Sequence, residues 1–239
     1  MNATPLAPAS FQVSPQALRW RRAWLVLMLL GLALSYPAAR LLPVSFGWEN
    51  GWLEDLQVVV LLSGAVMAGV FARQVVGNDG PGRAVKGLAL VLVPVWCLLA
   101  AREMSWGAVF LPPVGFSEDG PVYSSSVLWY KPAVYPLAAM VLAGCAWIFV
   151  RCRAYRVVLQ LLRSPQFAWA ELAVLVLAGV LSTYAEGHLG VALPHALLDQ
   201  ALVMEEWAEM FAYIALVAAQ RQVFVLLQST PRAPLAPVK

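Results

Sequence analysis

Charged residues, histidine and cysteine are all scarce in this chain of 239 residues. Only 12% of the residues are charged, which is about half the share found in ordinary soluble domains. The three cysteines form no CxxC pair, and a net charge of +3 is too small to indicate nucleic acid as a partner. Hydrophobic residues make up 61% of the chain and the mean hydropathy is +0.72, which excludes disorder and a conventional soluble globule. The composition therefore predicts an all-α, polytopic membrane protein.

Six apolar runs approach the roughly 20 residues that a helix needs to cross a bilayer. They cover 20–39, 52–73, 84–106, 132–150, 167–186 and 202–223. Because backbone polar groups find no water in hydrocarbon, we expect these runs to be helices. The chain then divides into an N-terminal tail at 1–19, a six-helix transmembrane domain at 20–223 and a C-terminal tail at 224–239. Arg19, Arg21 and Arg22 before the first run also resemble the start of a signal peptide, but the polar stretch ahead of them favours a retained helix.

The distribution of lysine and arginine predicts the orientation. With the N-terminus inside, 13 of these residues fall on the inner side and three, Arg40, Arg102 and Lys131, on the outer side. Both tails are therefore expected in the cytoplasm of a bacterial cell, with the protein in the inner membrane. The one long outer loop, 107–131, is rich in Pro, Gly and Ser, which favours an ordered cap or a re-entrant loop.

The acidic residues gather on the opposite side, where 11 of the 13 lie in outer loops or outer helix ends. Glu205 and Glu209 are one turn apart and share a face of the last run. Glu209 lies about 16 Å along the helix from Gln220, close to mid-membrane. A carboxylate facing lipid there costs on the order of 3 kcal/mol. We therefore expect both side chains to face the bundle interior, where they need a proton, a counter-ion or a bound cation.

Several outer helix ends are predicted to meet in one periplasm-facing pocket of acidic and histidine side chains. Glu103, Glu205 and Glu209 are the candidate catalytic acids and bases, because buried carboxyl groups suit proton transfer. The candidate substrate-binding residues are Arg102, Trp106 and Glu54. The candidate metal ligands are Glu186, His188, Glu205 and Glu209. His195 and Asp199, in the loop before the last run, are possible partners of the acidic side chains. No HExxH or Glu-x-x-His pair is present, so the cofactor stays unknown, with a divalent metal ion as the candidate.

Three functions remain open at this point. The first is a metal-assisted enzyme acting on a lipid-linked or membrane substrate; the second is a non-catalytic accessory or assembly subunit of a larger membrane complex. The third, a cation or proton transporter, is disfavoured because the inner halves of the runs hold few polar residues beyond Gln160, Glu171 and Gln220. The structural alternative for the acids is an internal ion-pair network in which Arg102 neutralises Glu205 or Glu206.

Two short motifs carry a resemblance to known proteins. They are RExSWG at 102–107 and EExxEM at 205–210. Together they resemble small multi-pass bacterial inner-membrane proteins of unknown function, which implies a membrane fold and no particular activity. The ceramidase-like membrane hydrolases, which use three His with a Ser and an Asp around zinc, do not match, because this chain has only two His.

Overall fold

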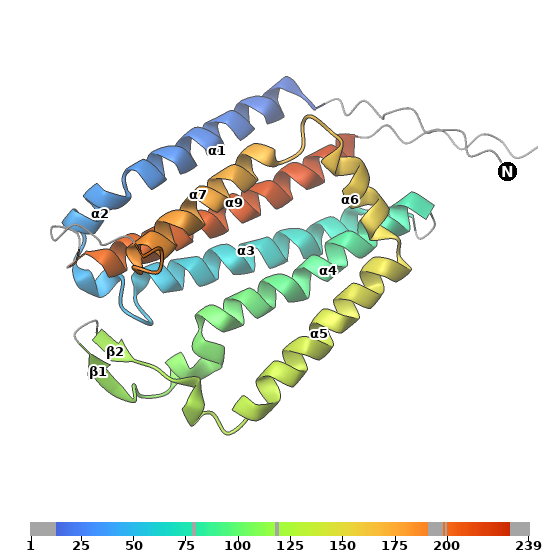
Figure 1. Cartoon of the computed structure of the whole chain (residues 1–239). Coiled ribbons are helices and arrows are strands. Elements are labelled where there is room, and N and C mark those ends of the chain that lie inside the picture. Colours follow the sequence, from blue (N-terminus) through green and yellow to red (C-terminus); the bar gives the residue numbers. More distant parts are fainter. Residues whose placement is uncertain (1–12, 78–79, 118–119, 191–197, 199, 230–239) are drawn as a thin grey trace, which may run out of the picture.

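The computed structural model describes residues 13–77, 80–117, 120–190, 198 and 200–229, and these are mostly helical. Four of the helices in this part of the chain are long and apolar enough to cross a membrane. They are α3 (Trp52–Gln74), α4 (Gly80–Glu103), α5 (Lys131–Arg151) and α9 (Ala201–Ser229). They lie side by side in one bundle (Figure 1). The prediction of a multi-pass helical membrane protein is thus supported, with four or five candidate spans found by length and apolarity.

The first predicted span is broken rather than continuous. It consists of α1 (Pro15–Ala33) and α2 (Ser35–Leu41), which meet at an angle of 55°. Pro37 explains the break, because its ring clashes with the carbonyl four residues earlier, at Ala33, and its nitrogen donates no hydrogen bond. At the other end, the Ser14 hydroxyl accepts a hydrogen bond from the Ala17 amide and starts α1 at Pro15.

The third predicted span, 84–106, ends earlier than expected. Helix α4 stops at Glu103, and Ser105, Trp106 and Gly107 all adopt positive φ angles. A sharp reversal of this kind needs the left-handed region, which is costly for Ser and Trp and free for Gly.

The outer loop that follows is largely built from short elements. They are η2 (Ser105–Phe110), β1 (Gly115–Ser117), β2 (Gly120–Val122) and η3 (Ser125–Val127). The two strands pair antiparallel, and the hairpin lies at the end of the bundle where α3 begins (Figure 1). The prediction was an ordered cap or a re-entrant loop, and the sequence pattern did not indicate strands. We call this outer segment the cap.

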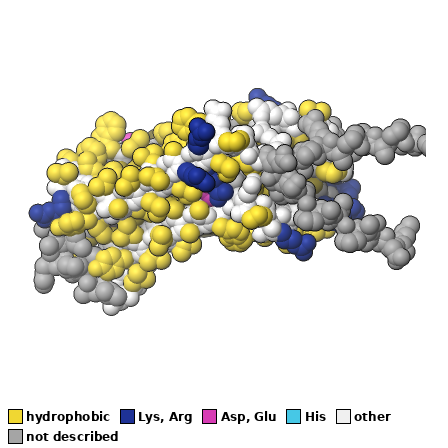
Figure 2. Space-filling view, turned by 90° about the horizontal axis from the view of Figure 1, so that it is seen from above, with side chains coloured by type: hydrophobic (Ala, Val, Ile, Leu, Met, Phe, Trp, Pro, Cys, Tyr) yellow, Lys and Arg dark blue, Asp and Glu magenta, His cyan; other side chains and the backbone are white. Residues whose placement is uncertain are grey.

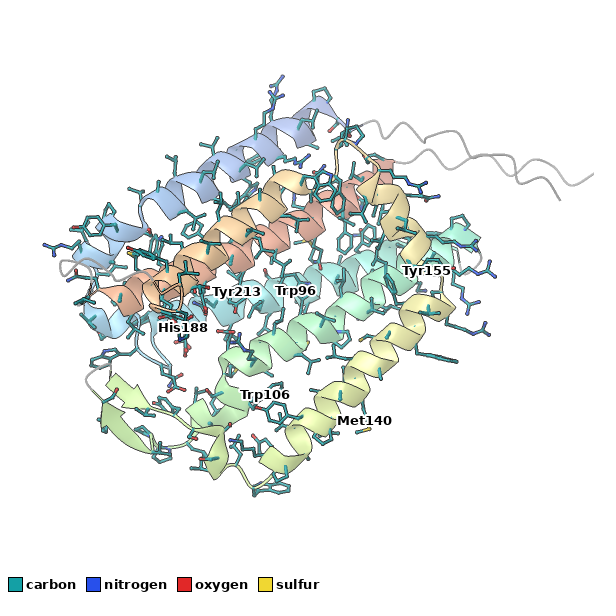
Figure 3. The ribbon with its side chains drawn as sticks, in the orientation of Figure 1. Trp96, Trp106, Met140, Tyr155, His188 and Tyr213 are labelled. Carbon is teal, nitrogen blue, oxygen red and sulfur yellow. The ribbon has the colours of Figure 1, made fainter. Side chains whose placement is uncertain are left out.

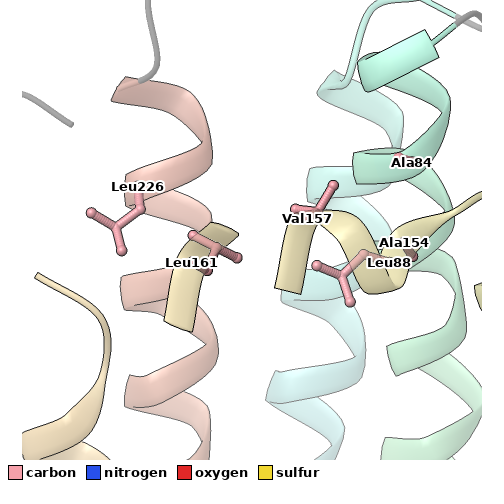
Figure 4. Packing of buried hydrophobic residues seen from close by; sticks show 6 residues of the cluster. All are labelled: Ala84, Leu88, Ala154, Val157, Leu161 and Leu226. Atoms are coloured by element: carbon pink, nitrogen blue, oxygen red, sulfur yellow. The ribbon is translucent and has the colours of Figure 1, made fainter. Parts of the chain in front are cut away.

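The fifth predicted span appears as α7 (Trp169–Ala185), which has 17 residues and is shorter than its neighbours. A short helix that the sequence analysis took for a loop, α6 (Ala154–Leu162), precedes it. Ala154, Val157 and Leu161 of α6 pack on Leu88 and Leu226, from α4 and α9 (Figure 4). This amphipathic helix closes the bundle at the end opposite the hairpin.

Helix α9 is the centre of the bundle and packs against α1, α2, α3 and α7. Close approach is visible at Gly31 of α1, where an added Cβ would overlap the Phe211 ring. Helix α5 stands at the edge, and only Val134 and Cys145 of its side chains are buried. Hydrophobic side chains cover much of the face seen in Figure 2, as expected of a surface in contact with lipid.

One buried ion pair joins α1 to α7 near the α6 end. The Arg21 Nε and Nη2 atoms donate to the two carboxylate oxygens of Glu171 at 2.7 and 2.8 Å. The same guanidinium also donates to the backbone carbonyls of Gln166 and Phe167. The Glu171 side chain is 2% exposed, so this carboxylate is fully matched inside the protein.

Candidate functional site

Four carboxylates from three helices meet at the hairpin end of the bundle. They are Glu54 of α3, Glu103 of α4, and Glu206 and Glu209 of α9, and we call them the acidic cluster. Each interacts electrostatically with two others: Glu54 and Glu209 both interact with Glu103 and with Glu206. Of the residues predicted to form the pocket, the structure brings Glu54, Glu103 and Glu209 into this cluster.

Each carboxylate of the acidic cluster accepts a hydrogen bond from a neutral donor. The Tyr213 hydroxyl donates to Glu103 at 2.8 Å, and the Ser182 hydroxyl donates to Glu209 at 3.2 Å. The Gln57 amide donates to the Glu206 carboxylate at 2.8 Å. The backbone amide of Asn50 donates to Glu54 at 2.6 Å. These bonds orient the carboxyl groups without neutralising them.

Arg102 is the only basic side chain with a described contact to the acidic cluster. Its Nη1 lies 3.3 Å from Glu103 Oε1, and its side chain is 67% exposed while that of Glu103 is 7% exposed. The guanidinium also acts electrostatically on Glu209. Arg102 thus forms an ion pair with its sequence neighbour Glu103. The alternative in which Arg102 neutralises Glu205 or Glu206 stays a prediction. Glu205 interacts electrostatically with Glu206.

The predicted metal ligands lie at the edge of this arrangement. His188 Nδ1 is 3.0 Å from Glu186 Oε2, with both side chains open to the surface, and Glu186 acts electrostatically on Glu209. Within the described residues, no three His, Cys, Asp or Glu side chains are arranged to hold a metal ion. His195 and Asp199 lie outside the described residues. The set of Glu186, His188, Glu205 and Glu209 therefore stays a prediction.

Trp106 faces the cap rather than the carboxylates. Its carbonyl accepts a hydrogen bond from Tyr130 at 2.9 Å, and its indole packs edge to face on Tyr135 of α5. Figure 3 shows Trp106 on the α5 side of α4, apart from Tyr213. The role indicated by these contacts is to hold the turn after Glu103, and nothing among them supports the predicted substrate contact.

The cap is tied to the bundle by Glu49. Its carboxylate accepts hydrogen bonds from the Ser105 hydroxyl at 3.0 Å and from the Tyr123 amide at 2.7 Å. Gly120 of the hairpin lies directly on the Trp48 indole, where a Cβ would approach to 2.6 Å. These contacts connect the loop before α3 to both η2 and the hairpin.

A hollow of about 290 Å³ lies between the first turns of α3 and the segment after α4. Glu54, Asp55, Asn50 and Glu103 supply its polar wall, and the remaining wall is apolar. Two members of the acidic cluster therefore face a space that is large enough for a small group.

A second polar layer lies below the acidic cluster. The Trp96 indole donates to Gln220 Oε1, and the Gln220 amide donates to the Gly64 carbonyl at 2.9 Å. Trp96, Gln220 and Gly64 each lie seven positions from a residue of the site on the same helix, namely Glu103, Tyr213 and Gln57. Seven residues extend about 10 Å along a helix axis. Figure 3 shows Trp96 further from the hairpin end than Tyr213. The bundle is thus closed by a hydrogen-bonded indole beneath the site.

Sequence reasoning left two participants, Tyr213 and Glu206, out of the predicted pocket. Tyr213 follows Glu205 and Glu209 at four-residue spacing on α9, so the helical repeat alone could have found it. Glu206 follows Glu205 directly and therefore points about a quarter turn away from that stripe. It joins the cluster through Gln57 of α3, a contact between helices that no sequence spacing indicates.

We compared the chain with protein families, curated proteins and solved structures. No family model, curated protein or solved structure matches it. The resemblance carried by RExSWG and EExxEM therefore stays a prediction, and the function rests on the chain's own residues.

Proposed function

We propose that this chain is an inner-membrane protein that binds a positively charged group at the acidic cluster from the periplasmic side. The observation that carries the proposal is the imbalance of charge. Four carboxylates interact with one another among apolar helices, their hydrogen bonds come from neutral donors, and their one described basic contact is an exposed arginine. Such groups hold protons or a cation in place of water.

The proposed topology has six spans, with both termini in the cytoplasm. Helix α7 supports the count, because 17 residues extend about 26 Å, close to the thickness of the hydrocarbon core. The excess of Lys and Arg at the α6 end supports the orientation, since basic residues favour the cytoplasmic side. The acidic cluster then faces the periplasm.

Acid–base chemistry on a membrane or lipid-linked substrate is the activity that this site suits. Glu103 is held by Tyr213 and faces the hollow, so it is placed to exchange a proton with a bound group. In the metal-assisted version of this proposal, Glu186, His188, Glu205 and Glu209 supply the ligands. The Trp96–Gln220–Gly64 layer supports a pocket rather than a transport path, because it fills the bundle below the cluster.

Cation-dependent stability of the protein in lipid nanodiscs tests the proposal. The unfolding temperature is measured with Zn²⁺, Mn²⁺, Mg²⁺ and methylammonium, and bound metal is measured by elemental analysis. We expect at least one cation to raise the unfolding temperature of the wild type but not of Glu103→Gln or Glu209→Gln. A bound metal that is lost in Glu186→Gln and His188→Gln supports the metal-assisted version. If no cation acts through the carboxylates, the proposal is wrong and the accessory-subunit alternative gains.

A further inference from the structure

We infer that the pocket opens sideways to the bilayer and takes the amine head of a membrane amphiphile. This inference rests on the proposed function and names the class of its ligand. It begins from the two unlike walls of the hollow. Glu54 and Glu103 lie on one side, whereas Val58, Val59, Val109 and Phe110 contribute hydrocarbon on the other. Carboxylates beside apolar side chains match a molecule that carries a positive charge on a hydrocarbon chain.

The apolar wall reaches the lipid-facing surface of the bundle. Val59 is 62% exposed and Phe110 is 75% exposed, although both line the hollow. Val59 lies seven residues into the candidate span α3, about 10 Å below its start. The neighbouring side chains Leu56, Leu62 and Val66 are exposed as well. The rim at Val59 is therefore at the depth of hydrocarbon, where lipid rather than water is in contact.

The water side of the same hollow is bounded by polar groups. Asn50 and Asp55 are exposed at the start of α3, and the Asn50 amide is bonded to Glu54. Glu49 fastens the adjoining cap to the loop before α3. A ligand held at Glu54 and Glu103 thus has polar groups toward the membrane surface and an apolar exit into the bilayer.

The amide of Gln57 is buried inside the acidic cluster and only its nitrogen is hydrogen-bonded. Gln57 is fully buried, and its Nε2 donates to both the carbonyl and the carboxylate of Glu206. Its Oε1 has no hydrogen-bond partner. Gln57 lies three residues from Glu54 on α3, so this amide sits within the acidic cluster. Gln57 Oε1 can therefore still accept a hydrogen bond from an N–H donor, and an ammonium group carries such donors together with the charge that the carboxylates need.

The size of the hollow limits what enters it. About 290 Å³ holds roughly ten water molecules at liquid density, which is enough for an amine head and the first methylenes of a chain. The rest of the hydrocarbon then stays in the bilayer beside Val59 and Phe110. No covalent step is required for this recognition.

Binding of dodecylamine to the protein in phosphatidylcholine nanodiscs tests the inference. A dansyl-labelled alkylamine serves as the reporter, and dodecylamine, dodecanol and methylammonium compete with it. We expect dodecylamine to compete best, and Glu103→Gln or Glu54→Gln to weaken its binding about tenfold or more. Methylammonium lacks the chain and should compete only at much higher concentration.

Two matched pairs of variants test the sideways opening. Val59→Trp narrows the apolar rim, whereas Val66→Trp makes the same change two turns deeper on the exposed face of α3 and away from the hollow. We expect dodecylamine binding to fall about tenfold in the first and to be unchanged in the second. Phe110→Ala and Phe116→Ala form the second pair, because both rings are exposed and only Phe110 lines the hollow. Only Phe110→Ala should weaken dodecylamine binding.

The outcomes separate this inference from the proposal beneath it. If methylammonium or a metal ion binds through Glu103 and the hydrocarbon chain of dodecylamine does not improve its binding, the acidic cluster binds a cation. The inference that its ligand is an amphiphile is then wrong. Equal effects of Val59→Trp and Val66→Trp also overturn the sideways opening. If no cation binds through Glu103, both ideas are rejected together.

Discussion

The two ends of the bundle bury acids in opposite ways. At the α6 end, Glu171 receives two hydrogen bonds from Arg21, and the same guanidinium donates two more to backbone carbonyls. At the hairpin end, four carboxylates repel one another and accept hydrogen bonds from an amide, two hydroxyls and a backbone N–H. The α6 end pairs its buried carboxylate with an arginine, whereas the hairpin end holds more carboxylates than it pairs with basic groups.

We interpret this difference as a structural role for the ion pair and the proposed binding role for the acidic cluster. A matched ion pair joins two helices and has nothing left to offer a ligand. Unmatched carboxylates are costly in an apolar bundle, and this cost supports the proposal that the acidic cluster binds a cation. The comparison predicts that charge removal is damaging at the first end and harmless to stability at the second.

Arg21→Met should produce the largest loss of stability. It leaves Glu171 buried without its partner, and breaking a buried pair costs about 3–5 kcal/mol. The measurement is the free energy of unfolding in mixed micelles titrated with a denaturing detergent. Arg22→Met is the matched control, because Arg22 is adjacent and exposed. The double variant Arg21→Met with Glu171→Leu should recover most of the loss. An equal effect of the two single arginine variants would show that the ion pair contributes nothing.

Gly64→Ala should have the next largest effect. An added Cβ would lie 2.6 Å from the Trp96 indole, which forces the ring away from Gln220. Overpacking of this kind costs about 1–3 kcal/mol. Gly144→Ala is the control, since a Cβ there meets nothing within 4 Å. Unfolding in mixed micelles again gives the comparison, and a Gly64→Ala variant as stable as Gly144→Ala contradicts the close packing of α3 on α4.

Removal of the Trp96–Gln220 hydrogen bond should have a smaller effect on the free energy of unfolding. A double-mutant cycle with Trp96→Phe and Gln220→Leu isolates its energy from the packing of the two side chains. Hydrogen bonds between membrane helices average about 0.6 kcal/mol, and we expect a coupling energy of that order. A coupling of zero indicates that the indole is held by packing alone and that the layer beneath the site is not maintained by polar contacts.

The buried ion pair at the α6 end was harder to predict from the sequence than the carboxylates at the hairpin end. Arg21 and Glu171 are 150 residues apart, and no spacing pairs them. On α9, Glu209 was found together with Glu205 because a helix repeats every 3.6 residues and places the two on one face, whereas Glu206 lies off that face. The spans followed from apolar length, since hydrocarbon thickness sets it. The break at Leu34, the end of α4 at Glu103 and the hairpin depend on local backbone conformation, which composition does not determine.

Glu209→Gln should have the smallest effect on stability and thereby sharpen the contrast with Glu171→Gln. The amide keeps an oxygen to accept the hydrogen bond from Ser182, and it removes one charge that repels Glu103 and Glu206. We expect the free energy of unfolding to be unchanged within about 0.5 kcal/mol, or to rise. Glu171→Gln should instead be destabilised by more than about 1 kcal/mol, because Arg21 keeps its buried charge without an anion. Unfolding of both variants in the same micelles gives the result. Similar losses in the two variants would mean that the acidic cluster is part of the scaffold after all, whereas a stable Glu209→Gln that fails to bind cations separates the site from the fold.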